Sequence, residues 1–180
     1  MRILKIFIGV GGVVAFLAVC LVATSSLSSF AQTDHFNGTW KLNLAKSKFS
    51  PGPPLQSLTL TYEAVGQGVK ITVKITDAEG KPIDIQSTAN YDGKDYPVTG
   101  DPNVDTIALK RIDAHKVDFT RKKAGKVVVT GTSVVSKDGK TLTLSAKGTN
   151  AKGEKTSDTL VFDKQSRHRF RRDGQAILRA

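Results

Sequence analysis

The chain has 180 residues, of which 39% are hydrophobic, so it is long enough for one packed domain and too short for separate cofactor and substrate domains. Lys and Arg number 27 against 16 Asp and Glu, and the formal net charge of +11 raises the question of an anionic partner. A single cysteine, Cys20, excludes a disulfide framework and a thiolate metal cluster.

The first segment has the pattern of a secretory signal peptide, which we expect to cover residues 1–31. A basic start is followed by an uncharged apolar run over residues 6–23, and small residues stand at Ser29 and Ala31. This pattern predicts cleavage after Ala31. The apolar run is also close to the shortest length that spans a bilayer, so an uncleaved membrane anchor over residues 6–23 remains the alternative. Either outcome predicts an exported protein, periplasmic or extracellular, whose body covers residues 32–163.

Apolar and polar residues alternate along this body with a period of two, the pattern of half-buried strands. In residues 69–75, for example, Val and Ile alternate with Lys and Thr. Only antiparallel sheets so regularly combine one wet face with one dry face, so the pattern predicts an all-β antiparallel fold. The same alternation recurs at residues 58–62, 83–89, 107–109, 117–119, 127–129, 142–146 and 160–162.

Short connections with turn residues join these segments, and Asp138-Gly139 is the strongest hairpin signal among them. Two longer stretches break the rhythm. Residues 45–55 contain three prolines and are predicted to be a loop, and residues 92–105 are predicted to divide the meander into an earlier and a later group. With the segment around Trp40, the pattern predicts an up-and-down meander of eight to ten strands that closes into a barrel. Closure removes exposed sheet edges and leaves room for side chains or one small ligand.

Gly38-Thr39-Trp40 at the start of a β meander resembles the Gly-x-Trp opening of the calycins, the lipocalin and fatty-acid-binding-protein barrels. Residues 36–49, together with the Lys-Asp-Gly-Lys-Thr-Leu-Thr hairpin at residues 137–143, also resemble a group of small exported bacterial lipocalin-like proteins of unassigned function. The resemblance implies a lipocalin-like barrel with a possible cavity, in which Gly38 and Trp40 close the floor. Fatty-acid-binding proteins hold the ligand carboxylate with an Arg-x-Tyr on a late strand. The last strand here reads Thr-Leu-Val-Phe, so that site is not implied.

Arg111 and Arg121 stand in register with the apolar residues of their strands, which predicts that both point inward. A buried charge is costly unless it is paired or wet, so either arginine could bind a carboxylate or phosphate. The turn at residues 113–115 places the two arginines at opposite ends of a hairpin, so they cannot serve one site. The alternative interpretation is that they reach solvent, or pair with an Asp or with the Trp40 floor. Tyr62, which points inward on its own strand, is the third candidate ligand contact.

The sequence contains none of the common hydrolase, metalloprotease or phosphate-loop motifs. His35, His115 and His168 are scattered without metal-ligand spacing. Residues 101–105 mimic the start of a calcium loop, but the glycine and the final glutamate of such a loop are missing, so their acidic residues are interpreted as turn formers. We therefore expect no catalytic site, no metal and no cofactor.

Residues 164–180 form a strongly basic tail whose only acidic residue is Asp173. Such an arm could contact an anionic membrane surface or an envelope polymer, and nucleic acid is not expected as a partner of an exported protein. A disordered, solvated extension is the alternative. The contact residues would be Arg167, Arg169, Arg171 and Arg172.

Two functions follow from these patterns. The first is a non-catalytic exported lipocalin-like protein that binds a small apolar or amphiphilic molecule in its barrel. The second is a cell-envelope structural or interaction protein that uses the barrel as a scaffold, with the basic tail or the N-terminal segment contacting anionic lipid or polymer. A hydrolase is a more distant third.

Overall fold

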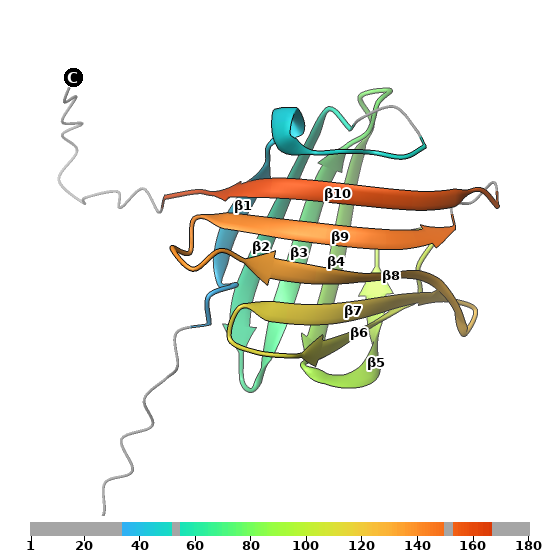
Figure 1. The fold of residues 1–180 in the computed structure, drawn as a ribbon. Helices are drawn as coiled ribbons and strands as arrows, with labels where there is room; N and C mark the ends of the chain where they lie inside the picture. Colours follow the sequence, from blue (N-terminus) through green and yellow to red (C-terminus); the bar gives the residue numbers. More distant parts are fainter. Residues whose placement is uncertain (1–33, 52–54, 150–152, 167–180) are drawn as a thin grey trace, which may run out of the picture. The chain divides into compact units, whose positions relative to one another are not determined.

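The structure is a computed structural model that describes residues 34–51, 55–149 and 153–166. Ten strands in these residues form one closed antiparallel barrel, which confirms the predicted fold class (Figure 1). A short 3-10 turn, η1 (Leu44–Lys46), follows the first strand. The strands are β1 (Gly38–Leu42), β2 (Ser57–Val65), β3 (Gly68–Thr76), β4 (Pro82–Asn90), β5 (Asp92–Thr99), β6 (Thr106–Arg111), β7 (Lys116–Lys123), β8 (Lys126–Val135), β9 (Thr141–Thr149) and β10 (Lys155–Lys164).

Two predicted segments lie outside the described residues. They are the signal peptide or anchor of residues 1–31 and the tail beyond residue 166, which carries Arg167, Arg169, Arg171 and Arg172. Within the residues that are described, no helix is both long enough and apolar enough to cross a membrane.

Each strand pairs with the next one along the chain, and β1 returns to pair with β10 through Trp40–Lys164 and Leu42–Phe162. In Figure 1, β7 to β10 cross steeply in front of β2 to β4. Closure gives every strand a partner on both sides, and unpaired strand edges remain where β4 and β5 are sparsely paired. We call the end of the barrel at which β1 begins the near end, and the opposite end the far end.

The wall has one weak seam, between β4 and β5. These strands pair only through Gln86–Thr99 and Ser87–Val98, whereas β3 and β4 pair along their whole length. The Ser87 hydroxyl adds a hydrogen bond by donating to the Pro97 carbonyl at 2.9 Å. The seam is therefore joined by few backbone pairs.

The prediction that residues 92–105 separate two groups of strands is wrong, because Asp92–Thr99 form β5. Pro97, which signals a loop in the sequence, lies in a strand whose pairing with β4 is sparse, so its missing N–H is tolerated there. Gly93 has a φ of 78° and lies within a register irregularity between Asp92 and Asp95, which disguises the strand further. Only residues 100–105 form an irregular loop, at the far end.

The prediction that Val127 shares the inward face of Val129 is also wrong. Arg121 pairs with Val129 but Lys122 pairs with Val127, so one extra residue enters β8 at this point. Because such a bulge shifts the alternation by one position, Val127 faces solvent and is 56% exposed.

The near end is filled by large side chains. Trp40 and Phe162 are fully buried, and Phe36, which precedes β1, is 1% exposed. The Trp40 indole Nε1–H donates to the Phe36 carbonyl at 2.7 Å, so the buried indole has a partner. The Lys164 ammonium lies 4.7 Å from the centroid of the Trp40 ring. Trp40 thus holds the segment before β1 against the end of β10.

A cluster that we call the Asp34 latch ties the same segment to the barrel. The Asp34 carboxylate accepts hydrogen bonds from Arg111 Nη2 at 2.6 Å, from Tyr91 Oη at 3.2 Å and from the Phe36 N–H at 3.1 Å. The Arg111 guanidinium also lies 3.8 Å from the centroid of the Tyr91 ring. A partly buried arginine that is paired and stacked in this way is already satisfied.

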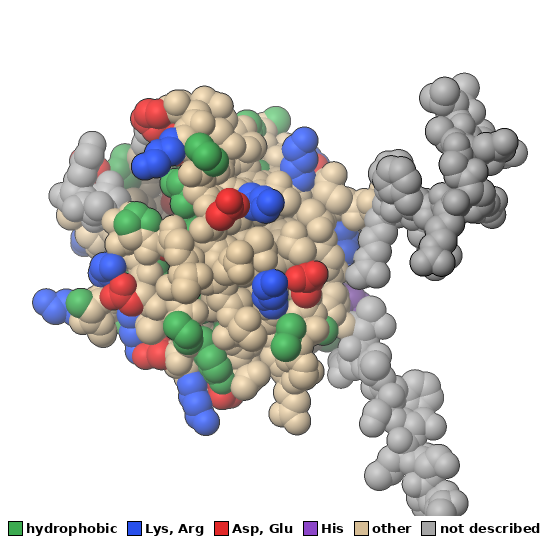
Figure 2. Space-filling view, turned by 180° about the vertical axis from the view of Figure 1, so that it is seen from behind, with side chains coloured by type: hydrophobic (Ala, Val, Ile, Leu, Met, Phe, Trp, Pro, Cys, Tyr) green, Lys and Arg blue, Asp and Glu red, His purple; other side chains and the backbone are tan. Residues whose placement is uncertain are grey.

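The outer face carries mixed charge. In Figure 2, basic and acidic side chains lie interspersed over the face seen from behind. Ion pairs such as Lys122–Asp95 and Lys123–Asp105, both at 2.7 Å, link neighbouring elements. No large region of one charge sign stands out on this face.

Candidate functional site

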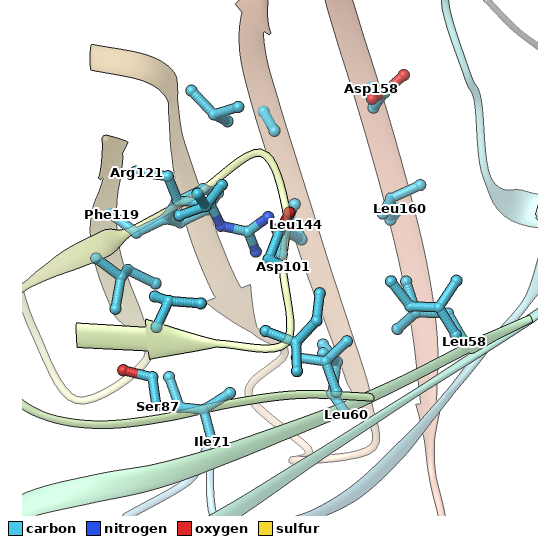
Figure 3. Close-up of a pocket in the computed structure, with 18 of the residues that line it drawn as sticks. Leu58, Leu60, Ile71, Ser87, Asp101, Phe119, Arg121, Leu144, Asp158 and Leu160 are labelled. Atoms are coloured by element: carbon cyan, nitrogen blue, oxygen red, sulfur yellow. The ribbon is translucent and has the colours of Figure 1, made fainter. Parts of the chain in front are cut away.

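The far half of the barrel contains a cavity of about 210 Å³ (Figure 3). Because side chains alternate along each strand, the inward-facing apolar residues on opposite sides of the barrel line this cavity. The loop of residues 100–105 covers it at the far end, where Val104 is only 5% exposed and lines the cavity. The apolar lining includes Leu58, Leu60, Ile71, Val73, Ile85, Ile107, Phe119, Leu144, Leu160 and Phe162.

Arg121 on β7 is the one basic residue among the described residues that line the cavity. In Figure 3 its guanidinium reaches from the strand into the interior. It makes no hydrogen bond or ion pair with any residue that the structure describes, and its central carbon lies 5.4 Å from the centroid of the Phe119 ring. Burial lowers the pKa of Arg121 from its ordinary value, and the nearby Asp101 opposes this shift. Because a guanidinium stays protonated even so, the cavity wall carries a positive charge that forms no ion pair with a described residue.

The two acidic residues of the lining are engaged in local structure. The Asp158 carboxylate accepts a hydrogen bond from the Ser50 N–H at 2.9 Å, and the Asp101 carboxylate accepts one from the Asn103 N–H at 2.8 Å. Asp105, in the same loop as Asp101, accepts from Lys123 Nζ and the Ala124 N–H, both at 2.7 Å. The acidic residues of the loop thus act as turn and ion-pair formers, as the sequence indicates.

A second, smaller cavity of about 40 Å³ adjoins the first on its near side, and we call it the inner chamber. Arg121, Leu60 and Phe119 line both spaces, so they form the boundary between them. The inner chamber adds three hydroxyl-bearing side chains, which are Tyr62 on β2, Tyr91 between β4 and β5, and Ser133 on β8. Ser133 is 5% exposed, and the tyrosine ring meets the Phe36 ring edge-on at 6.1 Å between centroids.

The structure separates the three predicted ligand contacts. Arg121 and Tyr62 both line the inner chamber, whereas Arg111 lies at the near end in the Asp34 latch and lines neither cavity. Arg111 and Arg121 therefore lie at opposite ends of the β6–β7 hairpin and serve different roles. Sequence reasoning missed Ser133, although its position in the β8 alternation, two residues before the buried Val135, carried the signal.

The structure also brings two of the scattered histidines together. The His35 and His115 rings stack with 4.1 Å between centroids. Stacked rings do not converge on one ion, and among the described residues no group of three potential ligands could hold a metal.

Tyr62 should make the stability of the barrel fall at alkaline pH. Burial raises the pKa of Tyr62 to about 12, with Arg121 acting in the opposite direction. Its stabilising contribution is complete below pH 10, where the unfolded chain also keeps the proton, and is lost as the pH rises from 10 toward 12. We expect the wild type to lose on the order of 1 kcal/mol per pH unit relative to Tyr62→Phe in this window. Urea denaturation at pH 9, 10 and 11 measures the difference, and parallel pH profiles of the two proteins would contradict the prediction.

No protein-family model and no curated protein matches the chain. Among solved structures it is similar to zebrafish ileal bile acid-binding protein complexed with cholic acid, with 11% identity over 73% of this chain and 99% of that chain and a TM-score of 0.43. It is also similar to two redesigned β-barrels bound to DFHBI. For mFAP1 the identity is 14% over 72% of this chain and 95% of that chain, with a TM-score of 0.40. For mFAP0 it is 13% over 72% and 99%, with a TM-score of 0.37.

These similarities are too remote to carry an argument about function. The barrel architecture rests on the strand pairing itself, and a calycin-like barrel is in keeping with that pairing. The resemblance of the opening and the late hairpin to exported bacterial lipocalin-like proteins is supported by no matching family and stays a prediction.

Proposed function

We propose that the protein is a non-catalytic binding protein that holds a small amphiphilic molecule in the far half of the barrel. The apolar part of the ligand packs against the cavity wall, and its anionic group pairs with Arg121. From the signal pattern at the start of the chain, we place this activity in an export compartment.

The observation that carries the proposal is the unpaired Arg121 guanidinium in an otherwise largely apolar lining. Arg121 is only partly exposed, and neither Asp101 nor Asp158 forms an ion pair with it, so removal of the guanidinium from bulk water is not offset by a salt bridge. A carboxylate supplies the missing partner and forms two parallel hydrogen bonds with the planar guanidinium.

The size of the cavity favours a compact ligand. Its volume of about 210 Å³ lies below the ~300–1,000 Å³ of pockets for drug-sized molecules. A carboxylic acid of medium chain length fits this description better than a long-chain fatty acid. Octanoate and the uncharged 1-octanol are therefore suitable probes.

Isothermal titration of the delipidated full chain tests the proposal. We expect octanoate to bind the wild type and to bind Arg121→Met at least tenfold more weakly, whereas 1-octanol binds both proteins alike. Lys122→Met is the matched control, because Lys122 is the next residue on β7 and pairs with Asp95 on the outer surface. This control should bind octanoate like the wild type. No octanoate binding, or equal binding to Arg121→Met, would overturn the proposal.

A further inference from the structure

The inner chamber carries an inference about the chemical class of the ligand, which rests on the proposed function. Of its three hydroxyls, Tyr91 Oη donates to Asp34, whereas Tyr62 Oη and Ser133 Oγ make no hydrogen bond with any residue that the structure describes. Hydroxyl groups in a protein interior nearly always have a hydrogen-bond partner, so a partner for these two is expected in the chamber that they line. Two hydroxyl groups therefore line a space in which no described side chain forms a hydrogen bond with them.

The size of the inner chamber fits one oxygen-sized group. A volume of about 40 Å³ exceeds the minimum for a single water molecule, which also needs two to four polar partners. Tyr62, Ser133 and Arg121 provide such partners around it. The chamber is too small for a hydrocarbon chain that would continue beyond Arg121.

The inner chamber lies next to the position that we propose for the anionic group of the ligand. Arg121 lines both the cavity and the chamber, so a carboxylate that pairs with it lies at their boundary. A substituent on the second or third carbon of the acid lies within a few bonds of that carboxylate. It can enter the chamber while the rest of the chain stays against Leu58 and Leu160 in the larger cavity.

We propose that the inner chamber is a hydroxyl subsite and that the ligand is a hydroxy acid, with its hydroxyl close to the carboxylate. The hydroxyl accepts a hydrogen bond from Tyr62 or Ser133 and can donate to the other. Burial keeps the tyrosine protonated, so it remains a donor throughout the neutral range. In the absence of ligand, one water molecule takes this place and bridges the two hydroxyls.

The subsite is tested by titrating octanoate, 2-hydroxyoctanoate and 3-hydroxyoctanoate into the full chain. At least one hydroxy acid should bind the wild type five- to tenfold more tightly than octanoate, because its hydroxyl reproduces the hydrogen bonds of the displaced water. This advantage should fall below twofold in Tyr62→Phe and in Ser133→Ala, while octanoate affinity changes little. Thr132→Ala is the matched control, since Thr132 is the neighbour of Ser133 on β8, lines neither the cavity nor the inner chamber, and donates to the Asp118 carboxylate at 2.7 Å. It should keep the full advantage.

The outcomes separate this inference from the proposed function. If octanoate binds in an Arg121-dependent manner but neither hydroxy acid binds more tightly, the subsite is overturned and the proposed function stands. An advantage that survives in both Tyr62→Phe and Ser133→Ala overturns the subsite as well. If none of the three acids binds, both proposals fail. A crystal structure of the ligand-free protein gives an independent readout, because a dry inner chamber contradicts the bridging water.

Discussion

Replacement of Arg121 by methionine should stabilise the ligand-free barrel by about 1–3 kcal/mol. The substitution removes a partly buried guanidinium that has no ion-pair partner among the described residues and puts an unbranched apolar side chain among Leu60, Phe119 and Leu144. Most substitutions in a protein interior destabilise the fold. A higher free energy of unfolding for Arg121→Met would therefore identify Arg121 as a residue that lowers the stability of the wild type.

Urea denaturation of both proteins without ligand measures this change. The Lys122→Met control should shift the free energy of unfolding by less than about 0.5 kcal/mol, because it removes a surface ion pair. With saturating octanoate, the wild type should have a higher free energy of unfolding than Arg121→Met, since a ligand stabilises only the protein that binds it. A loss of more than 1 kcal/mol in ligand-free Arg121→Met would show that the guanidinium is structural.

Replacement of Trp40 by alanine should destabilise the barrel by about 3–5 kcal/mol. Trp40 is fully buried, and its indole N–H satisfies the Phe36 carbonyl at 2.7 Å. The substitution leaves a large void at the near end and an unpaired carbonyl beside it. Since Trp40 lines neither cavity, octanoate affinity of the folded protein should change less than threefold.

Urea denaturation followed by circular dichroism measures the loss, because Trp40 is the only tryptophan and its fluorescence disappears with it. Leu44→Ala is a suitable control, since Leu44 is 43% exposed and should cost less than about 1 kcal/mol. A cost below 1 kcal/mol for Trp40→Ala would contradict the role of Trp40 as the plug of the near end.

The fold was predictable from the sequence to the extent that it depends on local alternation. The period of two and the Asp138-Gly139 turn predicted the antiparallel barrel, because each of these signals depends only on residues that are close together in the sequence. β5 was hidden because Pro97 and Gly93 are loop signals when the sparse pairing with β4 is not known. Val127 was misplaced because nothing local marks the extra residue that enters β8.

The candidate site was predictable only in part. Alternation points Arg111 and Arg121 inward equally well, and what distinguishes them is the partner of each. Arg111 finds Asp34, far away in the sequence and before the first strand, whereas Arg121 finds no described carboxylate within ion-pair distance. Ser133 has no motif around it, and only the closed barrel shows that it lines the inner chamber together with Tyr62. Such long-range pairings are not encoded in any short window of sequence.

The seam between β4 and β5 has a consequence for how a molecule could pass the wall. Its two residue pairs are fewer than those that join any other neighbouring strands of the barrel. Ile85, Ser87 and Val98 of this seam also line the larger cavity. The barrel wall therefore has its sparsest backbone pairing at the β4–β5 seam, and this seam lies beside the larger cavity. Separation of β4 from β5 breaks the fewest backbone pairs of any two neighbouring strands. It leaves the tightly filled near end undisturbed.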